Sequence, residues 1–254
     1  MPELRFAAPK ERRVAVITGG ARGIGAATAV RLAEAGRDVV IADVLAAEAA
    51  ETLAQVQAFG QQALFIPTDV GDEAAVQALA DRALAEFGRL DILVCCAGIF
   101  GQEAPYMDIP AEVFERVLRI NVLGVHFAHR ACLPHMLRQG WGRCVTITSG
   151  ARLGATHNVP YGVSKGAVWS FVQALGNAYP DKNVFVNGVE PGRALTQMVI
   201  PRFDQAHLDN PPGVPIGRYS DANEVAEVIE FLTSERNTYT TGAVWSSKGA
   251  SGWS

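Results

Sequence analysis

The sequence predicts an α/β protein built on a seven-stranded, doubly wound parallel sheet with helices on both faces. Short, strongly apolar runs alternate along the chain with longer segments in which apolar residues recur at helical spacing. The runs contain few polar residues, as expected of parallel strands buried on both faces. Nothing in this alternation divides the chain, so we expect one domain over residues 1–254.

Each element is expected from its own local pattern. The predicted strands are the apolar runs at residues 13–18, 38–42, 63–66, 91–96, 142–148, 184–189 and 243–246. The predicted helices are residues 24–35, 46–59, 72–87, 111–137, 160–179 and 221–233. Residues 193–217 are rich in proline and lack a clean period, so we expect them to form a lid that covers a substrate.

Composition and charge exclude several classes of partner. The chain is 49% hydrophobic and has a net charge of −4. Its lysines and arginines are scattered, which argues against binding to nucleic acid or to an anionic membrane surface. The apolar runs are far shorter than the roughly 18 residues needed to cross a bilayer, and residues 1–6 lack the apolar core of an export signal. We therefore expect a cytoplasmic protein that acts on a small molecule.

The cysteines and histidines do not suggest a disulfide or metal framework. The chain is neither small nor visibly secreted, so we expect free, buried thiols at Cys95, Cys96, Cys132 and Cys144. The histidines are scattered, and no metal site is expected.

A glycine-rich turn, TGGARGIG at residues 18–25, connects the first strand to the first helix. Glycines at such a turn let backbone amides approach the pyrophosphate of a dinucleotide, and the helix N-terminus adds partial positive charge. The turn residues expected to contact this cofactor are Gly19, Arg22, Gly23, Ile24 and Gly25.

Asp43 ends the second strand, eighteen residues after Gly25. A carboxylate there can accept hydrogen bonds from both ribose hydroxyls of adenosine and repels a 2′-phosphate, which favours NAD over NADP. The guanidinium of Arg22 could instead grip a 2′-phosphate. The alternatives are that Asp43 only starts the next helix and that Arg22 is a solvated loop residue. We expect Asp43 to prevail, because an uncompensated carboxylate beside a phosphate costs more than an idle arginine.

Asp69 and Val70 follow the third strand and are expected beside the adenine. Asp69 can bond the exocyclic amine, and Val70 can pack on the ring. Alternatively, Asp69 belongs to the N-cap region of the next helix.

Tyr161 and Lys165 are spaced Y-x-x-x-K, and Ser149 precedes the tyrosine by twelve residues. Residues four apart share one face of a helix, so the ammonium can lower the pKa of the phenol within one cleft. The phenol then serves as an acid/base near neutral pH. Such a pair also occurs on ordinary helix faces, and it is the ordered set with Ser149 and the glycine turn that predicts hydride transfer.

These motifs resemble the single-domain branch of the short-chain dehydrogenase/reductase family over residues 12–246. The other residues that carry the resemblance are Asp43, Asp69, Ala97, Gly98, Asn121, Pro191, Gly192 and Thr196. The resemblance implies a Rossmann-type subunit, a nicotinamide cofactor and a homotetramer or homodimer, with one interface formed by helices 111–137 and 160–179. It also implies a catalytic tetrad of Asn121, Ser149, Tyr161 and Lys165.

The tetrad residues have separate expected tasks. Ser149 hydrogen-bonds the substrate oxygen, Tyr161 exchanges the hydroxyl proton, and Lys165 holds the nicotinamide ribose and stabilises the tyrosinate. The resemblance assigns Asn121 to a water that connects Lys165 with solvent. The alternatives are a strand-end cap for Ser149 and a helix-kink residue for Asn121.

The remaining motif residues are expected on the cofactor. Ala97 and Gly98 belong to the predicted cofactor contacts. As the resemblance implies, Pro191 and Gly192 face the nicotinamide, and Thr196 bonds its carboxamide. The alternative for Pro191-Gly192 is a plain strand-ending turn.

Three departures from the family pattern lie outside the reacting atoms. Cys95-Cys96 stand where the family has Asn-Asn, and residues 247–249 read Ser-Lys-Gly where it has Asp-Gly-Gly. The loop between Ser149 and Tyr161 is about one residue short. We expect looser adenine-side contacts and a differently packed C-terminal segment.

The expected substrate contacts are Ser149, Arg152, His157, Tyr161 and Arg193, with Arg202 among the lid residues and with the loop at residues 100–106. A pair of guanidinium groups suits a carboxylate, sulfonate or phosphate, so we expect an anionic or highly hydroxylated substrate. Alternatively, these arginines reach solvent or bond the loop backbone.

The leading functional hypothesis is an NAD-dependent oxidoreductase that interconverts a secondary alcohol and a ketone. An alternative is an NADPH-dependent reductase of a ketone or 3-oxoacyl thioester. A more distant alternative is a non-catalytic protein that senses the dinucleotide.

Overall fold

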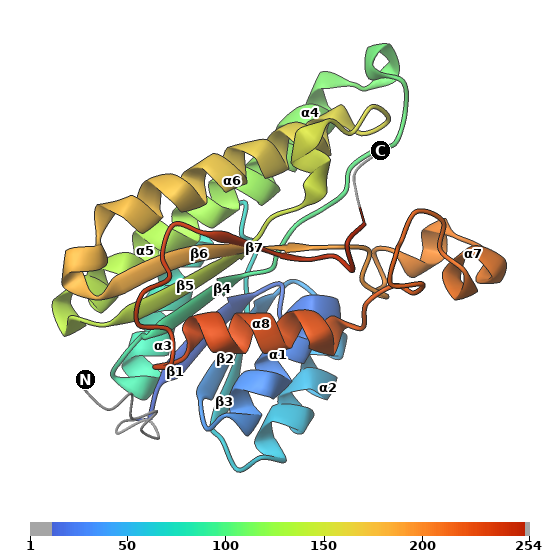
Figure 1. Cartoon of the computed structure of the whole chain (residues 1–254). Helices are drawn as coiled ribbons and strands as arrows, with labels where there is room; N and C mark the ends of the chain where they lie inside the picture. Colours follow the sequence, from blue (N-terminus) through green and yellow to red (C-terminus); the bar gives the residue numbers. More distant parts are fainter. Residues whose placement is uncertain (1–11, 252–254) are drawn as a thin grey trace.

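A computed structural model of the chain describes residues 12–251 (Figure 1). It confirms the fold class: seven strands form one parallel sheet in the order β3-β2-β1-β4-β5-β6-β7. The strands are β1 (Val14–Thr18), β2 (Asp38–Asp43), β3 (Ala63–Pro67), β4 (Ile92–Cys95), β5 (Gly142–Ile147), β6 (Val184–Pro191) and β7 (Val244–Ser247). Residues 1–6, from which we predicted the lack of an export signal, lie outside the described part.

Helices cover both faces of the sheet (Figure 1). The α-helices are α1 (Gly23–Glu34), α2 (Ala46–Gln57), α3 (Glu73–Phe87), α4 (Ala111–Leu118), α5 (Gly124–Gln139), α6 (Val159–Ala178), α7 (Gln205–Asp209) and α8 (Ala222–Thr233). The 3-10 turns are η1 (Tyr106–Asp108), η3 (Gly150–Leu153), η4 (Pro180–Lys182) and η5 (Ile200–Arg202). Among the described residues, no helix is long and apolar enough to span a membrane.

The core is divided by the sheet into two apolar clusters. One packs α3, α5 and α6 against the sheet through residues such as Leu79, Met136 and Val168. The other packs α1, α2 and α8 through residues such as Leu32 and Ile229. Because both sheet faces are covered, the strands read as nearly continuous apolar runs rather than alternating ones.

The reversal of strand order positions the site. The chain runs from β1 outward to β3 and then returns to place β4 on the other side of β1. The segments after β1 and β4 lead to helices on opposite faces of the sheet. In folds of this kind, the ligand binds in a crevice at the carboxyl ends of the strands where the order reverses.

The helix predicted over residues 111–137 is not regular. A π-helical segment, η2 (Arg119–Leu123), separates α4 from α5. The extra residue in this turn accommodates Asn121, whose buried side chain bonds the backbone of a neighbouring loop rather than its own helix. The prediction of one uninterrupted α-helix was therefore wrong at this point.

The four cysteines are free, as predicted. Cys95, Cys132 and Cys144 are buried, whereas Cys96 is only partly buried. Cys96 follows the last residue of β4 and packs against the apolar cluster beneath α1, α2 and α8. The expectation of four buried thiols was wrong for this residue.

Candidate active site

The glycine-rich turn lies at the carboxyl end of β1, against the end of β4. Gly19 has a φ of +68°, and a Cβ built on it would lie 2.5 Å from the amide nitrogen of Ala97. A Cβ on Gly25 would lie 2.0 Å from the carbonyl oxygen of Gly19. Both positions therefore require glycine, because the backbone segments approach too closely for a side chain.

Asp43 ties the second strand to this turn. Its Oδ2 accepts a hydrogen bond from the amide of Ala21 (3.0 Å). Its Oδ1 accepts from the amides of Val44 (2.8 Å) and Leu45 (3.2 Å), just before α2. Asp43 thus reaches both the turn and the start of the helix. Arg22 is exposed, and its side chain makes no hydrogen bond to any described residue.

Asp69 and Val70 follow β3. The Oδ1 atom of Asp69 accepts a hydrogen bond from the amide of Gly71 (2.8 Å), whereas the N-cap of α3 is Asp72. Val70 is buried, and its Cγ2 would lie 2.9 Å from a Cβ on Gly124. The contacts of Asp69 and Val70 with an adenine stay predictions.

Asn121 joins three segments around the crevice. Its Oδ1 accepts from the amide of Ile99 (2.8 Å), and its Nδ2 donates to the carbonyl of Ile99 (2.9 Å) and to Oγ of Ser164 (3.0 Å). The same Oδ1 would lie 3.2 Å from a Cβ on Gly98. Asn121 therefore fixes the loop after β4 against α6. The water that we predicted on this side chain stays a prediction.

Ser149, Tyr161 and Lys165 lie at the carboxyl end of β5 and on the first turns of α6. Nζ of Lys165 lies 5.6 Å from the ring centroid of Tyr161 and donates to the carbonyl of Ile147 (2.8 Å). Oγ of Ser149 accepts from the amide of Ala151 (3.2 Å), so it caps η3 and also lies beside the phenol.

The surroundings of Ser149, Tyr161 and Lys165 shift the pKa values of both the tyrosine and the lysine. Burial raises the pKa of Tyr161, while a side-chain hydrogen bond with Ser149 and the charge of Arg202 lower it. Burial lowers the pKa of Lys165 to about 8, opposed by the nearby thiols of Cys96 and Cys95. Burial thus makes the charged form of Lys165 less stable, and an anion formed beside the ammonium would stabilise it.

Thr196 belongs to the lid segment and returns to the glycine turn. A Cβ on Gly23, which has a φ of +58°, would lie 3.3 Å from Cγ2 of Thr196. Gly192, at the end of β6, is similarly close to Lys248, whose Cα would lie 2.9 Å from an added Cβ. The fold thus brings the segments after β1, β6 and β7 together, while the cofactor contacts of Gly23 and Thr196 stay predictions.

A family model described as short chain dehydrogenase matches residues 13–207. The chain belongs to this family. Its members are oxidoreductases that use nicotinamide dinucleotides.

Relatives of this short-chain dehydrogenase align along almost its whole length. Cis-4-hydroxycyclohexanecarboxylate dehydrogenase of Sinomonas cyclohexanicum is 40% identical and covers 91% of this chain and 93% of its own. 2-Dehydro-3-deoxy-L-rhamnonate dehydrogenase (NAD(+)) of a Sphingomonas species (strain SKA58) is 33% identical over 96% of this chain and 97% of its own. The crystal structure of NAD+-bound xylitol dehydrogenase has a TM-score of 0.88 and 31% identity, covering 95% of this chain and 100% of that one.

The glycine-rich turn of this short-chain dehydrogenase has the residue types that a dinucleotide cradle needs. Gly19 and Gly23 both have left-handed backbones. A Cβ on Gly19 would meet the backbone of Ala97, and one on Gly23 would meet the side chain of Thr196. The turn leads into the N-terminus of α1, and the amides of a helix N-terminus can bind an anion.

The predicted substrate arginines have different partners. Nε of Arg152 bonds Oε2 of Glu190 (2.9 Å), and Nζ of Lys248 bonds Oε1 of the same carboxylate (3.0 Å). The terminal nitrogens of Arg152 make no hydrogen bond to a described residue. Arg193 is exposed and donates from Nη1 to the hydroxyl of Tyr219 (3.0 Å). The structure does not bring the two guanidinium groups onto one partner.

His157 is exposed, and its carbonyl accepts a hydrogen bond from the amide of Ala104 (3.0 Å). It therefore joins the loop after β4 to the residues before α6 through its backbone. Its expected contact with substrate stays a prediction.

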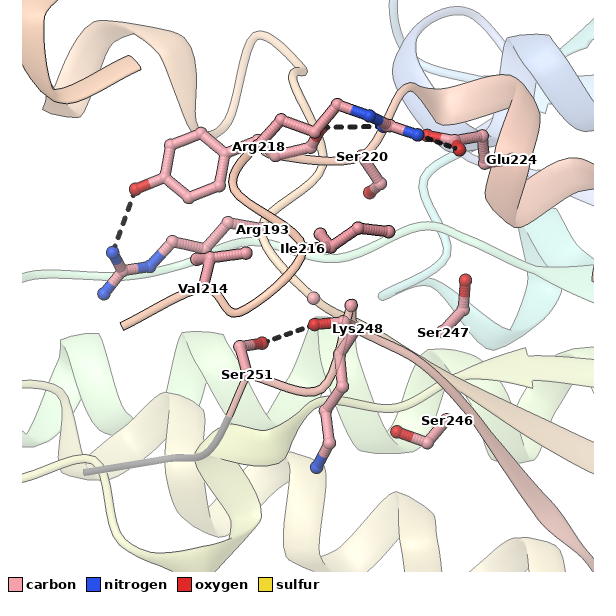
Figure 2. Close-up of a pocket in the computed structure, with 13 residues that line it drawn as sticks. Arg193, Val214, Ile216, Arg218, Ser220, Glu224, Ser246, Ser247, Lys248 and Ser251 are labelled. Carbon is pink, nitrogen blue, oxygen red and sulfur yellow. Dashed lines mark hydrogen bonds and ion pairs between the residues drawn. The ribbon is translucent and has the colours of Figure 1, made fainter. Parts of the chain in front are cut away.

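A pocket lies at the base of the lid segment, between residues 214–220 and the end of β7 (Figure 2). Arg218 forms an ion pair with Glu224 on one side of it. Lys248 and Ile216 come from opposite walls. Among the described residues, no group of three histidine, cysteine or acidic side chains forms a metal site.

Sequence reasoning missed Glu190. It is the charged residue of strand β6, and its side chain is only 3% exposed. That isolated charge was an available signal, because a carboxylate on a buried strand needs a cationic partner. The loop at residues 100–106 was expected to contact substrate, but no pattern marked the contact of Phe100 with Tyr161.

Proposed function

We propose that this short-chain dehydrogenase is an NAD-dependent oxidoreductase that interconverts a secondary alcohol and a ketone, with Tyr161 as the general acid/base. The observation that carries this proposal is the convergence of Tyr161, Lys165 and Ser149 at the carboxyl end of β5. The glycine turn lies at the same end of the sheet. A proton-transfer group and a dinucleotide cradle thus open into one crevice.

The roles follow from the chemistry of each side chain. In oxidation, the phenolate of Tyr161 takes the hydroxyl proton of the alcohol, and in reduction the phenol returns a proton to the forming alkoxide. Ser149 donates a hydrogen bond to the same oxygen. The ammonium of Lys165 favours the phenolate, because an opposite charge stabilises the ionised form. Asn121 positions a water that links Lys165 to solvent.

The bound nicotinamide supplies a hydride acceptor for the carbinol carbon in oxidation and a hydride donor in reduction. Lys165 would hold the nicotinamide ribose. The other residues that we assign to the cofactor are Gly19, Arg22, Gly23, Ile24, Gly25, Asp43, Asp69, Val70, Ala97, Gly98, Tyr161, Pro191, Gly192 and Thr196.

Asp43 supports NAD over NADP. Three backbone amides hold its carboxylate beside the glycine turn. A 2′-phosphate placed there meets a fixed negative charge, whereas ribose hydroxyls can donate to it. Arg22 favours a second candidate, an NADPH-dependent ketone reductase, because it is exposed in the same turn and its guanidinium bonds no described residue.

We infer a hydroxy acid as substrate. Both relatives described above are named for acids, a cyclohexanecarboxylate and a rhamnonate. The unbonded terminal nitrogens of Arg152 and the exposed guanidinium of Arg193 are suitable partners for a carboxylate. Residues 193–217 act as the lid of a one-domain subunit.

We also infer a homotetramer. The exposed apolar side chains of Leu123 and Val163 lie at helices α5 and α6, at the interface that the family resemblance predicts. Cytoplasmic location stays an expectation of the sequence.

The test is NADH formation from NAD with matched alcohols. The panel pairs cis-4-hydroxycyclohexanecarboxylate with its uncharged methyl ester and adds a polyol. We expect activity on the acid, and we expect Tyr161→Phe to lower kcat by orders of magnitude while cofactor affinity is kept. Near-normal turnover in Tyr161→Phe would contradict the mechanism, and equal use of acid and ester would contradict the substrate class.

A further inference from the structure

One lid arginine reaches across the crevice to the loop after β4. Arg202 lies in η5, within residues 193–217, and forms an ion pair with Glu103. Its guanidinium carbon lies 3.6 Å from the ring centroid of Phe100. The side chain of Arg202 is 24% exposed and that of Glu103 is 52% exposed. Arg202 is therefore largely removed from water, while the counter-charge on the opposite loop stays accessible.

Phe100 in turn contacts Tyr161, the proposed acid/base. The rings of Phe100 and Tyr161 are 4.6 Å apart between centroids, at an angle of 36°. Arg202, Phe100 and Tyr161 thus form a stack that begins on the lid and ends on α6. A guanidinium held over an aromatic ring is a favourable cation–π arrangement.

The loop side of this stack is fixed to α6. Nδ2 of Asn158 donates to the carbonyl of Phe100 (2.8 Å), while its Oδ1 accepts from the amide of Tyr161 (3.3 Å). Asn121 holds the adjacent residue, Ile99, through two hydrogen bonds. Phe100 is therefore held beside Tyr161 by hydrogen bonds through Asn158, whereas Arg202 belongs to the lid segment.

We propose that Arg202 is a positioning residue that closes the lid onto Phe100 and Glu103 and brings a positive charge beside Tyr161 only in the closed state. This inference rests on the proposed acid/base role of Tyr161. It predicts that lid closure and proton transfer are coupled, because a nearby cation stabilises the phenolate. The positive charge of Arg202 acts on the pKa of Tyr161 in that direction.

The other groups around Tyr161 set the background for a pH test. Lys165 faces it from the same helix, and Ser149 faces it from the end of β5. Arg202 is the cation contributed by the lid, with Glu103 behind it on the loop after β4. Removing Arg202 changes one of these influences on the pKa of Tyr161 and leaves Lys165 and Ser149 in place.

The first measurement needs no cofactor or substrate. The ultraviolet absorbance of tyrosinate is titrated in the wild type, in Tyr161→Phe and in Arg202→Gln, and the Tyr161 transition is the difference between the first two. In Arg202→Gln this transition should move to higher pH, and Arg202→Lys should largely restore it. An unchanged transition in Arg202→Gln overturns the proposal, whether or not the oxidoreductase assignment holds.

The second measurement follows kcat/KM for alcohol oxidation against pH. Activity should rise as Tyr161 loses its proton, and Arg202→Gln should shift this rise to higher pH, with roughly a threefold to tenfold loss at neutral pH. Arg82→Gln removes an exposed arginine of α3 and should leave the profile unchanged. An equal shift in both variants, or a rise in KM confined to acidic substrates, overturns the proposal.

Discussion

The two halves of the crevice are built in different ways. In the half formed by β1, β2 and β3, the backbone sets the geometry: Gly19 and Gly25 are needed because other backbone atoms occupy the space of a side chain. In the half formed by β5, β6 and the lid, side chains from distant segments hold one another, as Glu190 holds Arg152 and Lys248. The first half is therefore intolerant of added atoms. The second is sensitive to the removal of single charges.

The largest expected effect is in the first half. Gly25→Ala places a Cβ 2.0 Å from the carbonyl oxygen of Gly19 and should cost about 3 kcal/mol of unfolding free energy or more, with loss of NAD binding. Urea denaturation and calorimetry measure the two effects.

Gly166→Ala is a matched control for this prediction. Gly166 also lies in a helix, α6, but nothing lies within 4 Å of an added Cβ, so this variant should be at least as stable as the wild type. Equal losses in the two variants would contradict close approach as the reason for the glycine at position 25.

The second effect breaks the charge cluster of the other half. Glu190→Gln leaves Arg152 and Lys248 without their shared carboxylate and should lower the unfolding free energy by about 2 kcal/mol, since both cations are partly exposed. Urea denaturation of the single variant and of Glu190→Gln combined with Arg152→Met measures this. If Glu190→Gln is as stable as the wild type, the cluster does not hold this half together.

A third change tests charge in the backbone-built half. Asp43→Ala should shift the ratio of NADP to NAD affinity toward NADP by about tenfold, equivalent to about 1.4 kcal/mol. Calorimetric titration with both cofactors measures the ratio. Asp43→Asn is the comparison, because it removes the charge but keeps a hydrogen-bond acceptor for Ala21. Unchanged selectivity in both variants would place the discrimination at Arg22.

The smallest effect concerns an exposed pair at the base of the lid. Arg218 and the amide of Asp221 hold the pKa of Glu224 at about 2, below the ordinary value of 4.5. Because the folded-state pKa is lowered, the pair stabilises the protein above about pH 4.5, and this contribution is lost as the pH falls toward 2. The difference in Tm between the wild type and Glu224→Gln should shrink over that range. A difference independent of pH would assign the effect to the helix cap alone.

The contrast between the halves also explains what the sequence could predict. The positions of Gly19, Asp43 and the strand ends follow from local spacing, because parallel strands deliver their carboxyl ends to one edge. The same holds for Tyr161 and Lys165, which share a helix face. The structure confirmed the seven strands with shifts of one or two residues at their ends.

Side-chain pairing was not accessible in this way. We predicted that Arg152 and Arg193 act together, but one pairs with Glu190 and the other with Tyr219. Which partner an arginine takes depends on rotamers and on segments far apart in the chain. The π turn at Asn121 likewise arises from a tertiary contact with Ile99, and no helical period encodes it.

The ion pairs of Glu190 have a practical consequence for protein engineering. Lys248 follows the last strand, and the same carboxylate that binds it also binds Arg152 in the turn that begins at Ser149. An affinity tag or fusion partner appended to the C-terminal end therefore follows a segment that is linked to the catalytic loop through the ion pairs of Glu190. Kinetic comparisons between preparations are best made with such additions at the opposite end of the chain.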